Sequence, residues 1–66
     1  MVTYSMPNNT ITKHMFMRSS DGNAIYFMCP VKNMVIMYHD DEKDLARTQE
    51  ACPFCNDHAP EDKFNN

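Results

Sequence analysis

The sequence predicts a small α+β domain, in which a three-stranded antiparallel sheet of two hairpins is followed by one short helix. Segments rich in β-branched and aromatic residues flank two turn signals. A segment of helix formers without glycine or proline follows them. At 66 residues the chain forms at most one domain, and an apolar core of this size gives little net stability. A further stabilising element is therefore expected.

The first hairpin is predicted over residues 10–17 and 23–29. Asp21-Gly22 lies between these strands, and Gly22 is the only glycine in the chain, as the positive φ angle of a type I′ turn favours. With these two residues at the turn centre, residue 18 pairs with 25, and His14 lies directly across from Cys29 on the same face. A change of one residue in loop length would undo this register.

The second hairpin joins residues 23–29 to a third strand over residues 34–39. Pro30 ends the earlier strand because it has no N–H for the ladder. The segment PVKN then forms a turn that pairs Cys29 with Met34. Residues 1–9, interrupted by Pro7, are expected to be an irregular lead-in.

A helix is predicted from Asp40 to Ala51. Asp40 or Asp41 is the expected N-cap, the early acids complement the helix dipole, and Pro53 limits the end. Its apolar face is thin, with Leu45 and Cys52 seven positions apart. Residues 59–66 are expected to form a polar tail, so that residues 10–58 hold the core of a single domain spanning 1–66.

The cysteines predict a zinc site that makes the fold ribbon-like or knuckle-like. Cys52 and Cys55 form a C-x-x-C pair, a common zinc half-site because a tight turn lets two sulfurs reach one tetrahedral ion at about 2.3 Å. Cys29 is the third sulfur. An odd number of cysteines suits a site that one histidine completes.

Three histidines compete for the fourth position. His58 ranks first, because it follows Cys55 by three residues and needs no assumption about the sheet. His14 is nearly level with it, through the predicted pairing with Cys29. His39 ranks third, since it lies on the order of 16 Å along the strand from the turn. A site with four protein ligands has no open position for water or substrate, which indicates a structural role.

The motif CPFC, residues 52–55, is also similar to the active-site motif of glutaredoxin-like proteins. This resemblance implies an exposed thiolate at Cys52 as nucleophile and Cys55 as resolving thiol. In this chain the motif follows the acidic helical segment instead of a strand, and residues 56–66 are too few to build the rest of that fold. Thiol redox chemistry is therefore the third interpretation.

The predicted register gives the sheet a second apolar face, on which much of the chain's load of seven methionines is gathered. The side chains predicted to bind a partner are Met15, Met17, Tyr26, Met28 and Met37. Methionine is flexible and polarizable, which suits adaptable binding surfaces. Either this face contacts a second copy or another protein, or the N-terminal segment covers it through Val2, Tyr4 and Met6.

These observations favour a zinc-binding protein-interaction module without enzymatic activity: a regulator, adaptor or inhibitor of a larger protein, with the composition of a small phage-type protein. The second interpretation is a nucleic-acid-associated, zinc ribbon-like module. The formal charge of −3 and the scattered basic residues argue against nucleic acid. The chain shows neither a signal peptide nor a run long enough to span a membrane, so a cytoplasmic location is expected.

Overall fold

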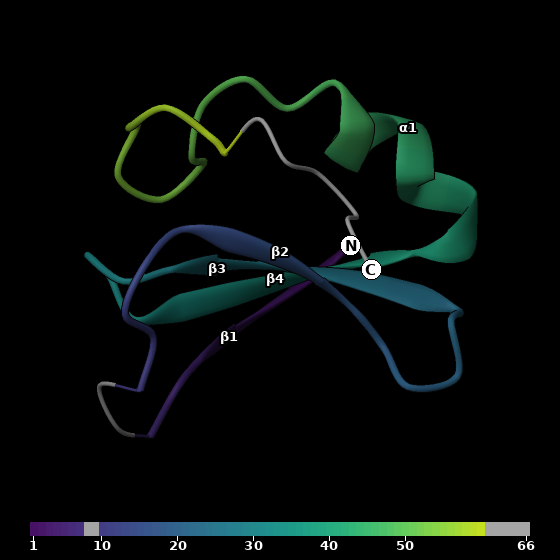
Figure 1. Cartoon of the computed structure of the whole chain (residues 1–66), viewed down its shortest axis with the longest axis horizontal. Coiled ribbons are helices and arrows are strands. Elements are labelled where there is room, and N and C mark those ends of the chain that lie inside the picture. The colour runs from purple at the N-terminus through teal and green to yellow at the C-terminus, as the bar shows by residue number, and fades with distance from the viewer. Residues whose placement is uncertain (8–9, 61–66) are drawn as a thin grey trace.

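The computed structural model describes residues 1–7 and 10–60. Four strands form one antiparallel sheet in the order β1-β4-β3-β2: β1 (Val2–Ser5), β2 (Met15–Arg18), β3 (Ala24–Cys29) and β4 (Met34–His39). A short 3₁₀ helix, η1 (Asp40–Glu42), leads into α1 (Lys43–Arg47). These helices and the segment that follows them lie over one face of the sheet (Figure 1). The predicted class, a small α+β fold with one short α-helix, is confirmed.

The predicted number of strands is wrong, because β1 lies in the segment expected to be irregular. It extends the sheet along β4, with Val2 opposite Met37 and Ser5 opposite Met34. Val, Thr and Tyr all favour strands. The segment has no turn signal joining it to a neighbour, however, since its partner strand is distant in the sequence. β1 also lies at the edge of the sheet and does not fold over the methionine-rich face.

The registers of both hairpins are as predicted. Arg18 pairs with Ile25, and Cys29 pairs with Met34. The first turn is wider than expected, because the N–H of Gly22 donates to the carbonyl of Ser19 at 3.0 Å. The loop contains one more residue on each side than predicted. Because the extension is symmetric, the same residues still pair, and the same side chains lie on each face of the sheet. β2 is shorter than predicted and begins only at Met15.

Gly22 has a φ of +77°, and an added Cβ would meet no atom within 4 Å. Gly22→Ala should therefore lower the free energy of unfolding by about 1–2 kcal/mol through backbone strain alone. Gly22→Asn is the matched control and should lose less, because Asn tolerates the left-handed region. Urea unfolding of the two variants measures the difference. Equal decreases in the free energy of unfolding of the two variants would mean that the positive φ angle does not cause the destabilisation.

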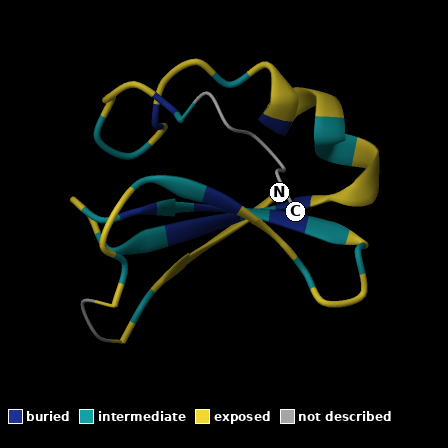
Figure 2. Cartoon of the chain, in the orientation of Figure 1, coloured by how far each residue is buried: buried dark blue, intermediate teal, exposed yellow. Residues whose placement is uncertain are grey.

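The core lies between the sheet and the segment that covers it. Its buried members are Phe16, Ile25, Phe27, Cys29, Ile36, Tyr38, Ala46 and Cys52. All the members from the strands belong to the face that the register predicted. Figure 2 shows these buried positions along the sheet and at the points where the covering segment approaches it.

The helix is shorter than predicted, and a different side of it faces the sheet. α1 ends at Arg47, and the Thr48 hydroxyl donates to the Asp44 carbonyl at 2.9 Å. Leu45, the predicted apolar contact, is 56% exposed, whereas Ala46 is fully buried. The preceding η1 turn has about three residues per turn instead of 3.6, which changes the side of the helix that meets the sheet.

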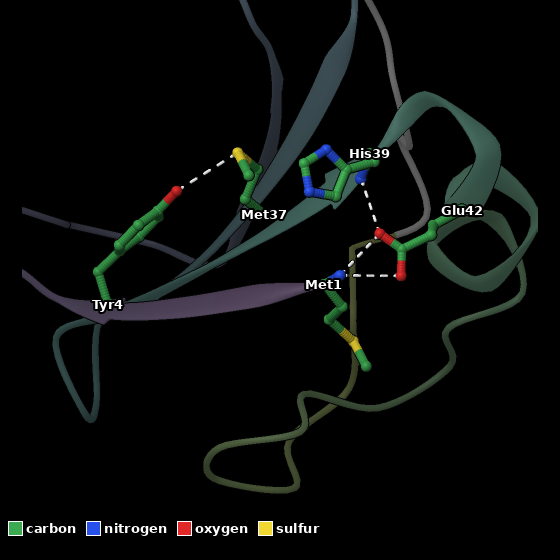
Figure 3. A network of polar contacts seen from close by, with 5 residues as sticks. All are labelled: Met1, Tyr4, Met37, His39 and Glu42. Carbon is green, nitrogen blue, oxygen red and sulfur yellow. Dashed lines mark hydrogen bonds and ion pairs between the residues drawn. The ribbon is translucent and has the colours of Figure 1, made fainter.

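The start of η1 is closed by Glu42 and not by an aspartate N-cap. Its carboxylate accepts from the backbone N–H of His39 at 3.0 Å and from the Met1 amine at 2.8 and 2.9 Å (Figure 3). The hydrogen bonds from the amine and from His39 lower the pKa of Glu42. In the same view the Tyr4 hydroxyl donates to the sulfur of Met37 at 3.3 Å. These contacts join β1 to β4 and to η1.

Candidate metal centre

Four side chains from distant parts of the sequence meet at one end of the sheet. They are His14, Cys29, Cys52 and Cys55, and their ligand atoms all lie within 4.8 Å of one another. His14 immediately precedes β2, Cys29 ends β3, and the other two cysteines belong to the loop after α1. In Figure 1 this loop lies over the end of the sheet at which β3 turns into β4. The fold therefore gathers three thiols and one imidazole into a single cluster.

Two of the distances within the cluster are close to those around a tetrahedral ion. Two sulfurs that are each about 2.3 Å from such an ion lie about 3.8 Å apart, and a sulfur and an imidazole nitrogen about 3.6 Å apart. The Sγ atoms of Cys29 and Cys55 are 3.7 Å apart. The His14 Nε2 atom is 3.2 Å from the Cys55 Sγ atom. The cluster has the size of a site for one ion.

Burial is uneven across the cluster. Cys29 is fully buried and Cys52 is 2% exposed, whereas His14 and Cys55 are half-buried. The ring of His14 stacks on the ring of Phe27, with centroids 5.9 Å apart. The imidazole is thus held by the core on one side, while the cluster is open to solvent along its His14 and Cys55 edge.

Two turns of the same sequence pattern, Cys-Pro-x-x-Asn, supply the cysteines. The first cysteine turn is residues 29–33 and the second is residues 52–56. Asn33 and Asn56 have φ angles of 54° and 65°, and among the described residues they are the two with positive φ besides Gly22. Asn is one of the few residues that adopt this conformation readily. The same backbone turn therefore presents a cysteine from each side of the cluster.

Backbone N–H groups in these turns face the sulfurs. In the second turn the N–H of Phe54 donates to the Sγ atom of Cys52 at 3.4 Å, and the N–H of Asn56 donates to the Cys52 carbonyl at 2.9 Å. In the first turn, N–H groups of Val31 and Lys32 stabilise the thiolate of Cys29. Such hydrogen bonds favour the charged form of a cysteine, which is the form that binds metals.

The pKa values of the thiols differ across the cluster. Burial raises the pKa of Cys29, but the N–H groups of its turn and hydrogen bonds from the other two thiols outweigh burial and lower it. The backbone N–H of Asp57 favours ionisation of Cys55, yet burial and the neighbouring Cys52 and Cys29 prevail and raise its pKa to about 11. Negative charge therefore accumulates here only with difficulty, and a divalent cation would relieve the repulsion.

Of the histidines predicted as candidate ligands, the structure places His14 beside the three cysteines, and not His58, which ranked first. His58 is exposed, and it forms an isolated β-bridge with Ala51. This bridge closes the loop around the second cysteine turn and places His58 outside the cluster. His39 is exposed at the far end of β4, opposite Ala24. The register that paired position 14 with Cys29 is what identified the neighbouring histidine.

The surroundings of Cys52 differ from those that the glutaredoxin-like motif implies. Cys52 is buried in a turn that follows α1, whereas that motif implies an exposed thiolate at a helix N-terminus.

The repeated Cys-Pro-x-x-Asn pattern is a sequence signal that the prediction did not use. The repeat is incomplete, because Lys32 in the first turn stands where the second turn has Cys55.

No family model matches this chain, and searches of curated proteins and of solved structures found no significant similarity. Within residues 1–7 and 10–60, no helix has both the length and the apolar character needed to cross a membrane.

Proposed function

We propose that this chain is a small zinc-binding module that acts by binding another protein chain and has no enzymatic activity. The observation that carries the zinc assignment is the convergence of four ligand atoms within 4.8 Å. Three thiolates and one imidazole are a donor set typical of structural zinc sites, whereas magnesium and calcium prefer oxygen ligands. Zn²⁺ would be held by His14, Cys29, Cys52 and Cys55.

A structural role for the ion is supported by where the covering segment after α1 meets the sheet. The bridge between Ala51 and His58 closes this segment on itself, and its described contacts with the core include the hydrogen bond from the Tyr38 hydroxyl to Gln49 and the packing of Phe54 beside the cluster cysteines. Four protein ligands would also fill a tetrahedral ion and leave no position for substrate. The ion would thus supply stability that a chain of this size lacks.

The binding role is supported by the face of the sheet that lies opposite the covering segment. We call it the open face; its side chains are Val2, Tyr4, Met15, Met17, Ala24, Tyr26, Met28, Val35, Met37 and His39. Val35 is buried within this face, and Met15, Tyr26, Met28 and Met37 are half-buried. Val2, Tyr4 and Met17 are each more than 40% exposed. Apolar patches of this kind commonly mark sites of protein contact.

The zinc assignment predicts a clear difference between two histidine variants. His14→Ala should weaken zinc binding by at least about 100-fold, because a direct ligand is worth more than the outer-shell partners whose loss costs 10–100-fold. His58→Ala, the matched control, should bind zinc as the parent chain does. Competition with a chromophoric chelator measures both affinities, and native mass spectrometry should find one zinc per parent chain.

Two results would contradict the assignment. A parent chain that folds and remains metal-free in the presence of zinc would exclude a structural zinc site. Loss of zinc from His58→Ala but not from His14→Ala would mean that a different histidine completes the site.

A further inference from the structure

The open face carries no Asp, Glu, Lys or Arg side chain, although these four residue types make up 23% of the chain. Its members are four methionines, two tyrosines, two valines, Ala24 and His39, and His39 lies exposed at the end of β4. A strongly charged partner would gain no ion pair on this face and would lose hydration of its own charges. The chemistry of the face therefore fits a neutral, apolar surface.

The charges of the chain are concentrated on the opposite side. Residues 40–60, which cover the other face of the sheet, contain six acids and two bases, a net charge of −4. Two copies that approached through these segments would repel each other. If two copies met instead through their open faces, the sheets would lie about 10 Å apart with the acidic segments on the outside. Those segments would then be separated by more than twice the Debye length of about 8 Å.

We infer that the open face binds the open face of a second copy of this chain, giving a symmetric pair with two sheets inside and two acidic segments outside. This inference names the partner in the binding role proposed above and rests on that proposal. The face is compatible with its own copy because it is largely apolar and has no acidic, Lys or Arg side chain, and its one histidine, His39, lies at the end of β4. Methionine and tyrosine side chains also form favourable sulfur–aromatic contacts.

The face is small. β3 and β4 are six residues long and β1 and β2 are four, so at about 3.3 Å per residue and about 4.8 Å per strand the face covers about 320 Å². Stable interfaces bury about 800 Å² on each partner. The pair should accordingly be weak and concentration-dependent.

Sedimentation equilibrium of the zinc-loaded full chain tests the inference, from about 10 µM to about 1 mM. The parent mass should rise from one chain towards two. Met17→Lys places a charge on the open face at a side chain that is 43% exposed, and it should raise the dissociation constant at least about tenfold. Leu45→Lys is the matched control: it is the same charge change at a side chain that is 56% exposed on α1, and it should leave pairing intact.

Salt gives a second readout. Pairing through a largely apolar face should persist when the ionic strength is raised, whereas association through charges would be screened. A parent chain of constant single mass over the whole concentration range would overturn the inference. So would equal losses of pairing in Met17→Lys and Leu45→Lys. Zinc content, measured on the same samples by native mass spectrometry, shows separately whether the zinc assignment holds.

Discussion

Removal of zinc from the proposed centre by a strong chelator under reducing conditions should unfold most of the molecule. Apparent binding free energies of structural zinc are about 10–16 kcal/mol near neutral pH, whereas a domain of this size has only about 3–5 kcal/mol from its core. Without the ion, Cys29 and Cys52 remain as buried polar groups, and the segment around the second cysteine turn loses its main attachment. Circular dichroism and amide hydrogen exchange, with and without chelator, measure the loss of structure.

Cys52→Ser is the variant that separates loss of the ion from an effect of the chelator itself. It removes one of the two most buried sulfurs, so it should show the same loss of structure in zinc-containing buffer. Added zinc should restore the parent chain after chelation and should not restore the variant. A chelated parent chain that keeps its protected amides would show that the core suffices without the metal.

Phe27→Ala should be the most damaging single change in the apolar core. Phe27 is fully buried and packs between two rings, with its centroid 4.9 Å from that of Phe16 and 5.9 Å from that of His14. Truncating a buried phenylalanine costs about 3–5 kcal/mol, which is comparable to the whole stability of a small domain. The His14 ring would also lose its packing surface, so zinc affinity should fall together with stability.

Urea unfolding and chelator competition on zinc-loaded protein measure these two effects. Phe27→Leu keeps most of the volume and should lose less than about 1.5 kcal/mol. Tyr26→Ala is the control on the neighbouring position, because Tyr26 is half-buried on the open face and does not contact the cluster. Similar decreases in the free energy of unfolding of Phe27→Ala and Tyr26→Ala would contradict the placement of the core between the sheet and its covering segment.

Local signals explain why the hairpins could be predicted. Asp21-Gly22 and the segment after Cys29 fixed the registers of neighbouring strands, and alternation along those strands then identified the buried face. β1 could not be found in this way, since Val2–Ser5 pairs with residues that are 29 to 35 positions away. The side of α1 that faces the sheet was predicted wrongly, because it depends on the 3₁₀ turn before the helix.

The candidate site shows the same division. Composition and spacing indicated three sulfurs, and the register of the first hairpin placed His14 across from Cys29. The choice between His14 and His58 could not be made from spacing. It depends on the bridge between Ala51 and His58, which closes the loop around the second cysteine turn and keeps His58 out of the cluster.

The two cysteine turns share one sequence pattern, but together they supply only three of the four candidate ligands. Lys32 stands in the first turn where Cys55 stands in the second. The fourth candidate ligand is His14, which belongs to neither turn. A centre built from two complete turns would join only the end of the sheet to the loop after α1. By taking its fourth donor from His14, this centre would also anchor the stretch at residues 10–14, which has no strand partner. The ion would then order a part of the chain that backbone pairing leaves unsupported.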